Sequence, residues 1–317
     1  MKKKLKKAII ITALIALVLS VPIIIFHTRA PVLIVSDEVF IGFYGDKRIR
    51  REAFFASIVL FRNVKTVSVV DDAADDIIAL AVQGRAAQPY CVLFPFRFAD
   101  SAAIYHSQNP DISVILLEGR DIDNKNRSAS SNSDIINFLK YKNDIESDYY
   151  KAGVLAAAFK LPSDPESEES LPAEIKKRTV ILFLESRLNS LYGPKIRESF
   201  QRGLNEHENP PEFMFYTSYS SYTEISSLSC VVLSGIGSEF LENKNGIPVI
   251  VFTWLNPALL TSSAAVVVND SPWAQVVQAV KMLEAGVTDG LLKSKFVVVS
   301  GNKKADKDVL NKVKEIR

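Results

Sequence analysis

Charged and aromatic side chains recur directly after the short apolar runs of this sequence. Asp37 and Phe40 follow the apolar run at 31–36, and Phe96 and Arg97 follow a later one. Carboxylate and guanidinium groups form hydrogen bonds with hydroxyl groups, and aromatic rings pack on apolar ring faces. These residue types therefore favour the binding of a small ligand with ring faces and hydroxyl edges, such as a sugar or a nucleoside.

The second half of the chain has the same arrangement. Arg187 follows the apolar run that begins at Arg178, and Trp254 and Asn256 stand at the end of another. We predict that these residues also belong to the ligand site. The sequence leaves an alternative open, in which the aromatic residues belong to the core and Arg97 is a solvated surface residue.

Signatures of enzymes are mostly absent. His106 and His207 have no partner at metal-ligand spacing, and Cys91 and Cys230 stand far apart. No P-loop or nucleophile elbow occurs, and the turn at 234–237 lacks the third glycine of a dinucleotide fingerprint. We therefore predict a protein that is not an enzyme and that binds no cofactor and no metal. An α/β hydrolase or transferase that uses only Asp and Glu remains the open enzymatic alternative.

The candidate residues must be positioned by a repeated alternation of strands and helices. Nearly continuous Val, Ile and Leu runs are typical of parallel strands that are covered on both faces. The sequence predicts strands at 31–37, 65–72, 91–95, 112–119, 178–186, 212–218, 229–235, 247–254, 264–270 and 296–301. In open α/β sheets, ligands bind outside the carboxyl ends of the strands, which is where the candidate residues stand.

Helical spacing of apolar residues occurs between these runs. It predicts helices at 48–63, 71–87, 144–160, 194–208, 271–286 and 305–317. Ser271 is a good helix N-cap, and Pro272 suits the first helical position. Two successive strand–helix series predict an α/β fold with two Rossmann-like units, each with its own parallel sheet. Cys91 and Cys230 each open an apolar run, which favours two buried thiols in different units over a disulfide.

The chain begins with lysines that precede an uncharged apolar run at 8–26. This layout predicts a signal peptide or a membrane anchor within residues 1–30, with contact to the membrane through residues 8–26. The lysines place the rest of the chain outside the cytoplasm in either case. The net charge is +2, and five lysines lie in this leader, so the remainder is mildly acidic and has no basic face for nucleic acid.

The order of motifs from 144 to 286 is specific. Asp148 leads a helix rich in small residues, and Pro194 opens the pattern that ends at Gly203 and Leu204. The runs IPVIVFTW and NDSPWAQVVQAVKMLEAG follow. This order resembles the type I periplasmic binding protein superfamily, and within it the basic membrane protein branch and the sugar- or nucleoside-binding branches.

The resemblance implies two hinged lobes that close on a ligand. Lobe 1 would comprise 31–142 plus 268–290, and lobe 2 would comprise 143–267 plus 291–317. It implies an extracytoplasmic solute-binding protein of an ABC-type importer, with a small-molecule ligand and an ABC permease as partners. Asp148 then joins the predicted ligand contacts. The alternative is a membrane-tethered ligand sensor or scaffold that keeps the fold without transport.

Overall fold

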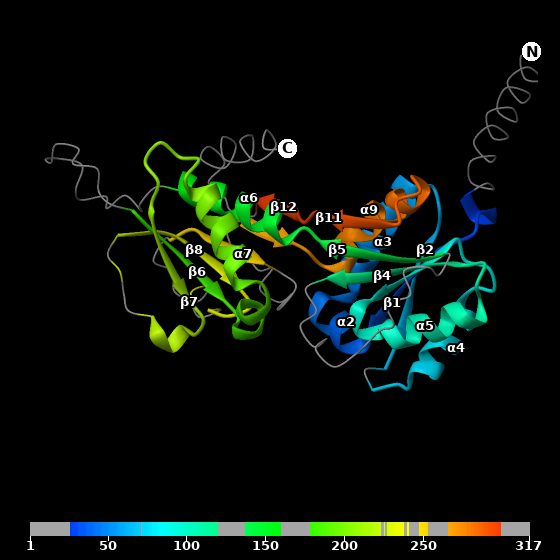
Figure 1. Cartoon of the computed structure of the whole chain (residues 1–317). Coiled ribbons are helices and arrows are strands. Elements are labelled where there is room, and N and C mark those ends of the chain that lie inside the picture. Colours follow the sequence, from blue (N-terminus) through cyan, green and yellow to red (C-terminus); the bar gives the residue numbers. More distant parts are fainter. Residues whose placement is uncertain are drawn as a thin grey trace, which may run out of the picture. The chain divides into compact units, whose positions relative to one another are not determined.

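The protein contains two six-stranded sheets that are mainly parallel (Figure 1). The computed structural model describes residues 26–70, 72–119, 137–159, 178–222, 225, 227–237, 240, 247–252 and 266–298. The strand orders are β11-β5-β4-β3-β1-β2 and β12-β10-β9-β8-β6-β7. This arrangement confirms the predicted α/β class with two Rossmann-like sheets.

The first sheet is built around β1, whose residues are all buried. Its strands are β1 (Val32–Asp37), β2 (Val64–Val69), β3 (Cys91–Pro95), β4 (Ser113–Gly119), β5 (Phe138–Asn143) and β11 (Asp289–Leu292). β1 pairs in parallel with β2 on one side and with β3 on the other, and Val32 lies opposite both Val64 and Cys91. Its helices are α2 (Glu38–Tyr44), α3 (Asp46–Leu60), α4 (Asp75–Arg85) and α5 (Ala99–Gln108).

The second sheet repeats this plan around β6. Its strands are β6 (Thr179–Leu184), β7 (Glu212–Tyr216), β8 (Leu228–Ser234), β9 (Val249–Phe252), β10 (Val266–Asn269) and β12 (Lys295–Val298). β6 pairs in parallel with β7 and β8, whereas β12 runs antiparallel to β10. Its helices α6 (Ile145–Ala158) and α7 (Ser186–Leu204) pack on one face, against the core formed by β6, β8, β9 and β10.

Two glycines allow α6 and α7 to approach each other closely. A Cβ added at Gly153 would fall on the carbonyl oxygen of Phe200, and a Cβ added at Gly203 would fall on that of Tyr150. Each helix therefore presents a glycine to the backbone of the other. The close packing of the two helices therefore explains the small residues in the segment 144–160 and the Gly203–Leu204 pair in α7.

The described residues divide into two compact units. Within the described residues, the division falls inside β4 after residue 117, inside β5 after residue 140, inside α9 (Pro272–Glu284) after residue 275, and inside β11 after residue 289. The lobe boundaries that we expect from the sequence, after residues 142, 267 and 290, stay a prediction.

Among the elements that differ from the sequence expectations are α2, β5 and β11. No helix was predicted at residues 38–44, which form α2 with Asp37 as its N-cap. β5 was not predicted, since its buried and exposed residues alternate instead of forming a continuous apolar run. β11 was not predicted either, because it is short and mostly exposed.

Two expected segments lie outside the described residues. These are the membrane-contacting run at 8–26, apart from Phe26, and the helix at 305–317. Within the part of the chain that the structure describes, no helix combines the length and the apolar character needed to cross a membrane.

The prediction of two buried thiols in different units is confirmed. Cys91 lies in β3 and Cys230 in β8, and both are free and fully buried. Burial raises the pKa of the Cys91 thiol to about 12 and also raises the pKa of Cys230. Both groups therefore remain protonated and unreactive in the folded protein.

Candidate functional site

The first sheet has a topological switch point between β1 and β3. After β1 the chain continues to β2 on one side, and after β3 it continues to β4 on the other side. Where neighbouring connections leave in opposite directions, a crevice forms at the carboxyl ends of the strands, and ligands bind there in open α/β sheets. The residues that end β1 and follow β3 are therefore the first candidates for a site.

Asp37 ends β1 and makes two interactions at this switch point. Its Oδ1 accepts a hydrogen bond of 2.6 Å from the Phe40 amide and so caps the N-terminus of α2. Its Oδ2 lies 3.0 Å from Nη1 of Arg97, which follows β3 in the short helix η1 (Phe96–Phe98). The Asp37 side chain is 7% exposed and the Arg97 side chain is 41% exposed. The aspartate is therefore a buried anchor that holds an arginine open to solvent.

Aromatic residues flank this ion pair. The Arg97 guanidinium lies 5.0 Å from the ring centre of Phe98, which is buried. Phe96 is partly buried and packs against the core of the first sheet, together with the fully buried Phe94. The structure thus brings Asp37 and Arg97 together, places Phe96 beside them along the chain, and assigns Phe94 and Phe98 to the core.

The second sheet has its own switch point between β6 and β8. Glu185 follows β6, and its Oε2 accepts a hydrogen bond of 3.0 Å from the Leu188 amide, which caps α7. The Glu185 amide donates to the carbonyl oxygen of Ser234 at the end of β8, at 3.0 Å. The Ser234 hydroxyl is in turn hydrogen-bonded to the Tyr149 hydroxyl. Glu185 therefore occupies the same topological position as Asp37, although the set of predicted contacts omitted it.

Aromatic side chains gather on the other face of the second sheet. Tyr216, Tyr219, Tyr222 and Phe240 surround the buried ring of Phe183, with ring centres 5.3 to 6.0 Å from it. The three tyrosines are half-buried, so they combine ring faces with polar hydroxyl tips. They come from the end of β7 and from the segment after it, which includes η2 (Tyr219–Ser221).

The other predicted contacts have different positions. Asp148 in α6 is fully buried, and its carboxylate accepts hydrogen bonds from the backbone amide (3.2 Å) and the hydroxyl of Ser294. It therefore holds the connection between β11 and β12. Arg187 lies in the first turn of α7, next to the β6–β8 switch point. Trp254 and Asn256 lie outside the described residues.

The two described histidines of the folded units have internal partners. His106 in α5 is buried with its ring 5.6 Å from that of Phe138, and burial lowers the pKa of its imidazole. His207 accepts a hydrogen bond of 3.1 Å from the Asn209 amide. Among the residues that the structure describes, no group of His, Cys, Asp and Glu could hold a metal ion.

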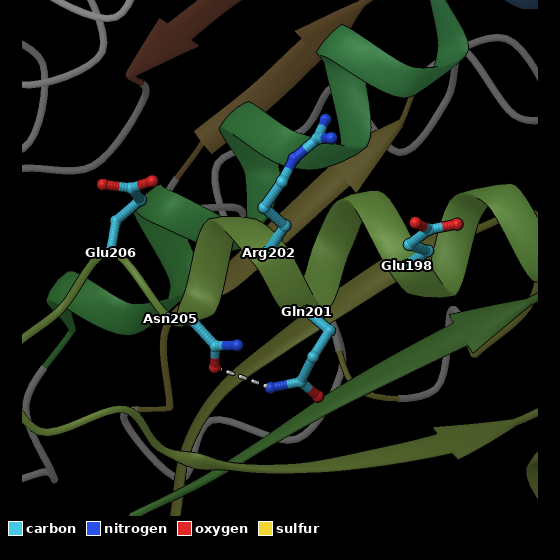
Figure 2. A pocket seen from close by; sticks show the side chains of 5 residues that line it. All are labelled: Glu198, Gln201, Arg202, Asn205 and Glu206. Atoms are coloured by element: carbon cyan, nitrogen blue, oxygen red, sulfur yellow. Dashed lines mark hydrogen bonds between the residues drawn. The ribbon is translucent and has the colours of Figure 1, made fainter.

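A shallow surface pocket of ≈ 490 Å³ lies along the C-terminal half of α7 (Figure 2). Its lining consists of charged and amide side chains, namely Glu198, Gln201, Arg202, Asn205 and Glu206. Gln201 donates a hydrogen bond to Asn205 at 3.0 Å, and Arg202 lies over the Tyr150 ring. Since α7 begins at the carboxyl end of β6 and extends about 28 Å at 1.5 Å per residue, this pocket is at the opposite end from the switch point.

The two sheets and their switch points have the fold of the type I periplasmic binding proteins, as the resemblance implied. A solute-binding protein of an ABC transporter system from Conexibacter woesei superimposes with a TM-score of 0.55 at 11% identity, over 91% of this chain and 96% of that chain. A periplasmic solute-binding protein from Actinobacillus succinogenes with bound D-allose gives 0.51 at 12% identity, over 88% and 99% of the two chains.

A transcriptional activator of the comK gene from Bacillus halodurans is similar to the same extent. Its TM-score is 0.52 at 12% identity, over 90% of this chain and 96% of that chain. At such identities the likeness concerns the fold alone. No family model and no curated protein sequence matches this chain. These three proteins are two solute-binding proteins and one regulator of transcription.

Proposed function

We propose that this chain is an extracytoplasmic solute-binding protein whose ligand is a small, neutral, hydroxylated molecule. The observation that carries the proposal is the ion pair between Asp37 and Arg97 at the β1–β3 switch point. The buried carboxylate orients the guanidinium, and the solvent-exposed arginine offers N–H donors in a rigid fork to ligand hydroxyl groups. Arg97 is the contact residue in this proposal, and Asp37 positions it.

The charge of the pair favours a neutral ligand over an anion. Asp37 lies 3.0 Å from Arg97 and compensates its positive charge. The pair as a whole is neutral, so an anionic group on the ligand would gain little net attraction. A sugar or a nucleoside therefore fits better than a sugar phosphate or a sugar acid.

Ring faces are the second requirement for such a ligand. Phe40 and Phe96 are partly exposed near the ion pair. A bound sugar in a protein of the same fold, D-allose, makes monosaccharides the first class to test. We also propose that an ABC permease receives the ligand.

Isothermal titration calorimetry on the purified full chain tests the proposal. The titrants are D-allose, D-ribose, D-glucose, adenosine and guanosine, together with ribose 5-phosphate as the anionic comparison. For a ligand that binds, Arg97→Gln should raise the Kd about 10- to 100-fold, because a hydrogen bond to a charged group contributes about 1.5–3 kcal/mol. Glu198→Gln, in the polar pocket at the far end of α7, is the matched control and should leave the Kd unchanged.

The outcomes separate the proposal from its competitors. Heat from a neutral sugar or nucleoside that depends on Arg97 supports it. Binding that survives Arg97→Gln would move the site elsewhere. A preference for ribose 5-phosphate over ribose would contradict the argument from charge compensation.

The alternative function is a membrane-tethered ligand sensor. A transcriptional activator has the same fold, so proteins with this fold also serve functions other than transport, which supports the alternative. We propose that the chain is exported through its lysine-led apolar run. Mass spectrometry of the mature N-terminus discriminates between the two functions, because a retained run indicates a tethered receptor and a cleaved one indicates a freely diffusing carrier.

A further inference from the structure

Helix α3 exposes a stripe of large apolar side chains to solvent. Phe54, Phe55, Ile58 and Val59 are 62%, 57%, 55% and 54% exposed. They follow one another at intervals that place them on a single face of the helix. The opposite face, which carries Ile49, Ala56 and Leu60, is the buried one. Contiguous exposed apolar groups of this size mark interaction surfaces.

The outer face of α3 carries basic residues in the turn that precedes the apolar stripe. Lys47, Arg50 and Arg51 are exposed and lie on the N-terminal continuation of the apolar stripe, at spacings of three and four residues. With Arg48, α3 has four basic residues, and its acidic residues Asp46 and Glu52 pair with Arg50 and Arg48. Four positive and two negative charges leave the helix at +2.

The chain enters the first unit beside this stripe. Phe26 is the last residue of the apolar run and the first described residue. Its ring packs edge-on at 5.9 Å from the ring of Phe61, the C-cap residue of α3. Arg29 also lies over the Phe61 ring and donates a hydrogen bond to the Phe61 carbonyl oxygen at 3.4 Å. The apolar run therefore reaches the fold at the C-terminal end of α3, where the apolar stripe lies.

We propose that the outer face of α3 binds an anionic lipid surface. A helix with basic residues and exposed phenylalanines on its outer side is typical of elements that lie in the membrane interface. The lysine-led run of the same chain ends at Phe26, whose ring packs on Phe61 at the end of this helix, so we infer that the run brings the lipid surface to the stripe. The apolar side chains enter the acyl boundary, and Lys47 and Arg51 contact lipid phosphates.

A second copy of the chain is a less suitable occupant. In a symmetric dimer the same patch meets itself, so an interface over this face brings the basic residues of both copies to one contact area. Like charges there oppose association, whereas an anionic lipid surface attracts them. The proposal does not depend on the identity of the ligand, and failure of either leaves the other standing.

The test uses the full chain with one introduced cysteine that carries an environment-sensitive NBD label. Cys91 and Cys230 are buried, so the label attaches to the introduced residue alone. Val59→Cys places it on the stripe, and Ala103→Cys places it on the exposed side of α5 as the matched control. The proteins are mixed with phosphatidylcholine vesicles, with or without phosphatidylglycerol. Vesicle binding through the N-terminal run does not by itself change the label at 59, so insertion is the measured quantity.

We expect the label at residue 59 to shift its emission to shorter wavelength and to be quenched by doxyl-labelled lipid, but not the label at 103. Phe54→Ser combined with Phe55→Ser should reduce the inserted fraction at 59 about tenfold or more, because two phenyl groups that would be buried in the lipid are lost. Arg51→Gln should reduce it about fivefold, and only on vesicles with phosphatidylglycerol.

Three results would overturn the proposal. The first is an aqueous emission at 59 on every vesicle. The second is equal quenching at 59 and 103, which indicates unspecific adsorption. The third is burial of the label at 59 without lipid, accompanied by concentration-dependent dimers in sedimentation, which would assign the stripe to a second copy. Circular dichroism of each variant confirms that it is folded before the comparison.

Discussion

Two substitutions of Asp37 separate its roles as a helix cap and as an ionic partner. The carboxylate caps α2 through the Phe40 amide and holds Arg97 through its other oxygen. Asparagine caps helices as well as aspartate does, but it has no charge. Asp37→Asn therefore removes the ion pair alone, whereas Asp37→Ala removes both interactions.

The expected magnitudes follow from the geometry. Loss of a capping side chain costs about 1 kcal/mol. The ion pair contributes less than about 1 kcal/mol, because the Arg97 side chain is 41% exposed and its charge is screened by solvent. Asp37→Ala should thus lower the free energy of opening α2 by about 1.5–2 kcal/mol, and Asp37→Asn by about 0.5 kcal/mol. These values correspond to about 10- to 30-fold and about 2-fold more frequent opening.

Hydrogen-exchange mass spectrometry of the peptide that covers α2 measures this opening directly. The peptide that covers α4 is the internal control, and its exchange should stay unchanged in both variants. Equal exchange of α2 in Asp37→Ala and Asp37→Asn would show that the cap contributes nothing. Unchanged exchange in both variants would remove Asp37 as the anchor of the site.

Three further predictions concern stability and reactivity. Gly203→Ala should cost more than about 2 kcal/mol in urea unfolding followed by tryptophan fluorescence, because α6 and α7 must separate, whereas Gly84→Ala on open α4 surface should be neutral or slightly stabilising. Burial lowers the pKa of His106, so its neutral form is favoured in the fold; stability should fall as pH drops below 6.5, and His106→Gln should weaken this dependence in pH-resolved melting. Cys91 and Cys230 should react with Ellman's reagent only after unfolding.

Strands whose residues are nearly all buried were predicted closely. β1, β3 and β6 are continuous apolar runs, and their bounds agree with the structure to within two residues. β5 is different because residues such as Lys140 and Lys142 interrupt its apolar pattern, and its pairing depends on a neighbour far away in sequence. Local composition therefore identified the continuous apolar strands and missed β5 and β11, which lie together at one margin of the first sheet.

The same limit applies to the candidate site. Asp37 and Arg97 were both predicted, but their contact was not, because it requires β1 and β3 to be adjacent, which is a property of strand order. Asp148 was predicted as a ligand contact, but its side chain is fully buried. Its hydrogen bonds with Ser294 show that it stabilises the fold, and the sequence does not reveal these bonds. A carboxylate directly before a helix is the signal that could have selected Glu185.

The two switch points share a design and differ in what they offer. In each unit a carboxylate follows the central strand and caps the next helix, Asp37 before α2 and Glu185 before α7. In the first unit the carboxylate also holds an exposed arginine, whereas in the second unit the backbone of Glu185 meets Ser234, which is bound to a buried tyrosine. The first unit therefore offers an exposed guanidinium with the partly exposed ring of Phe96 beside it along the chain. This combination of donor groups and a ring face is the reason to expect a sugar or a nucleoside at the first switch point.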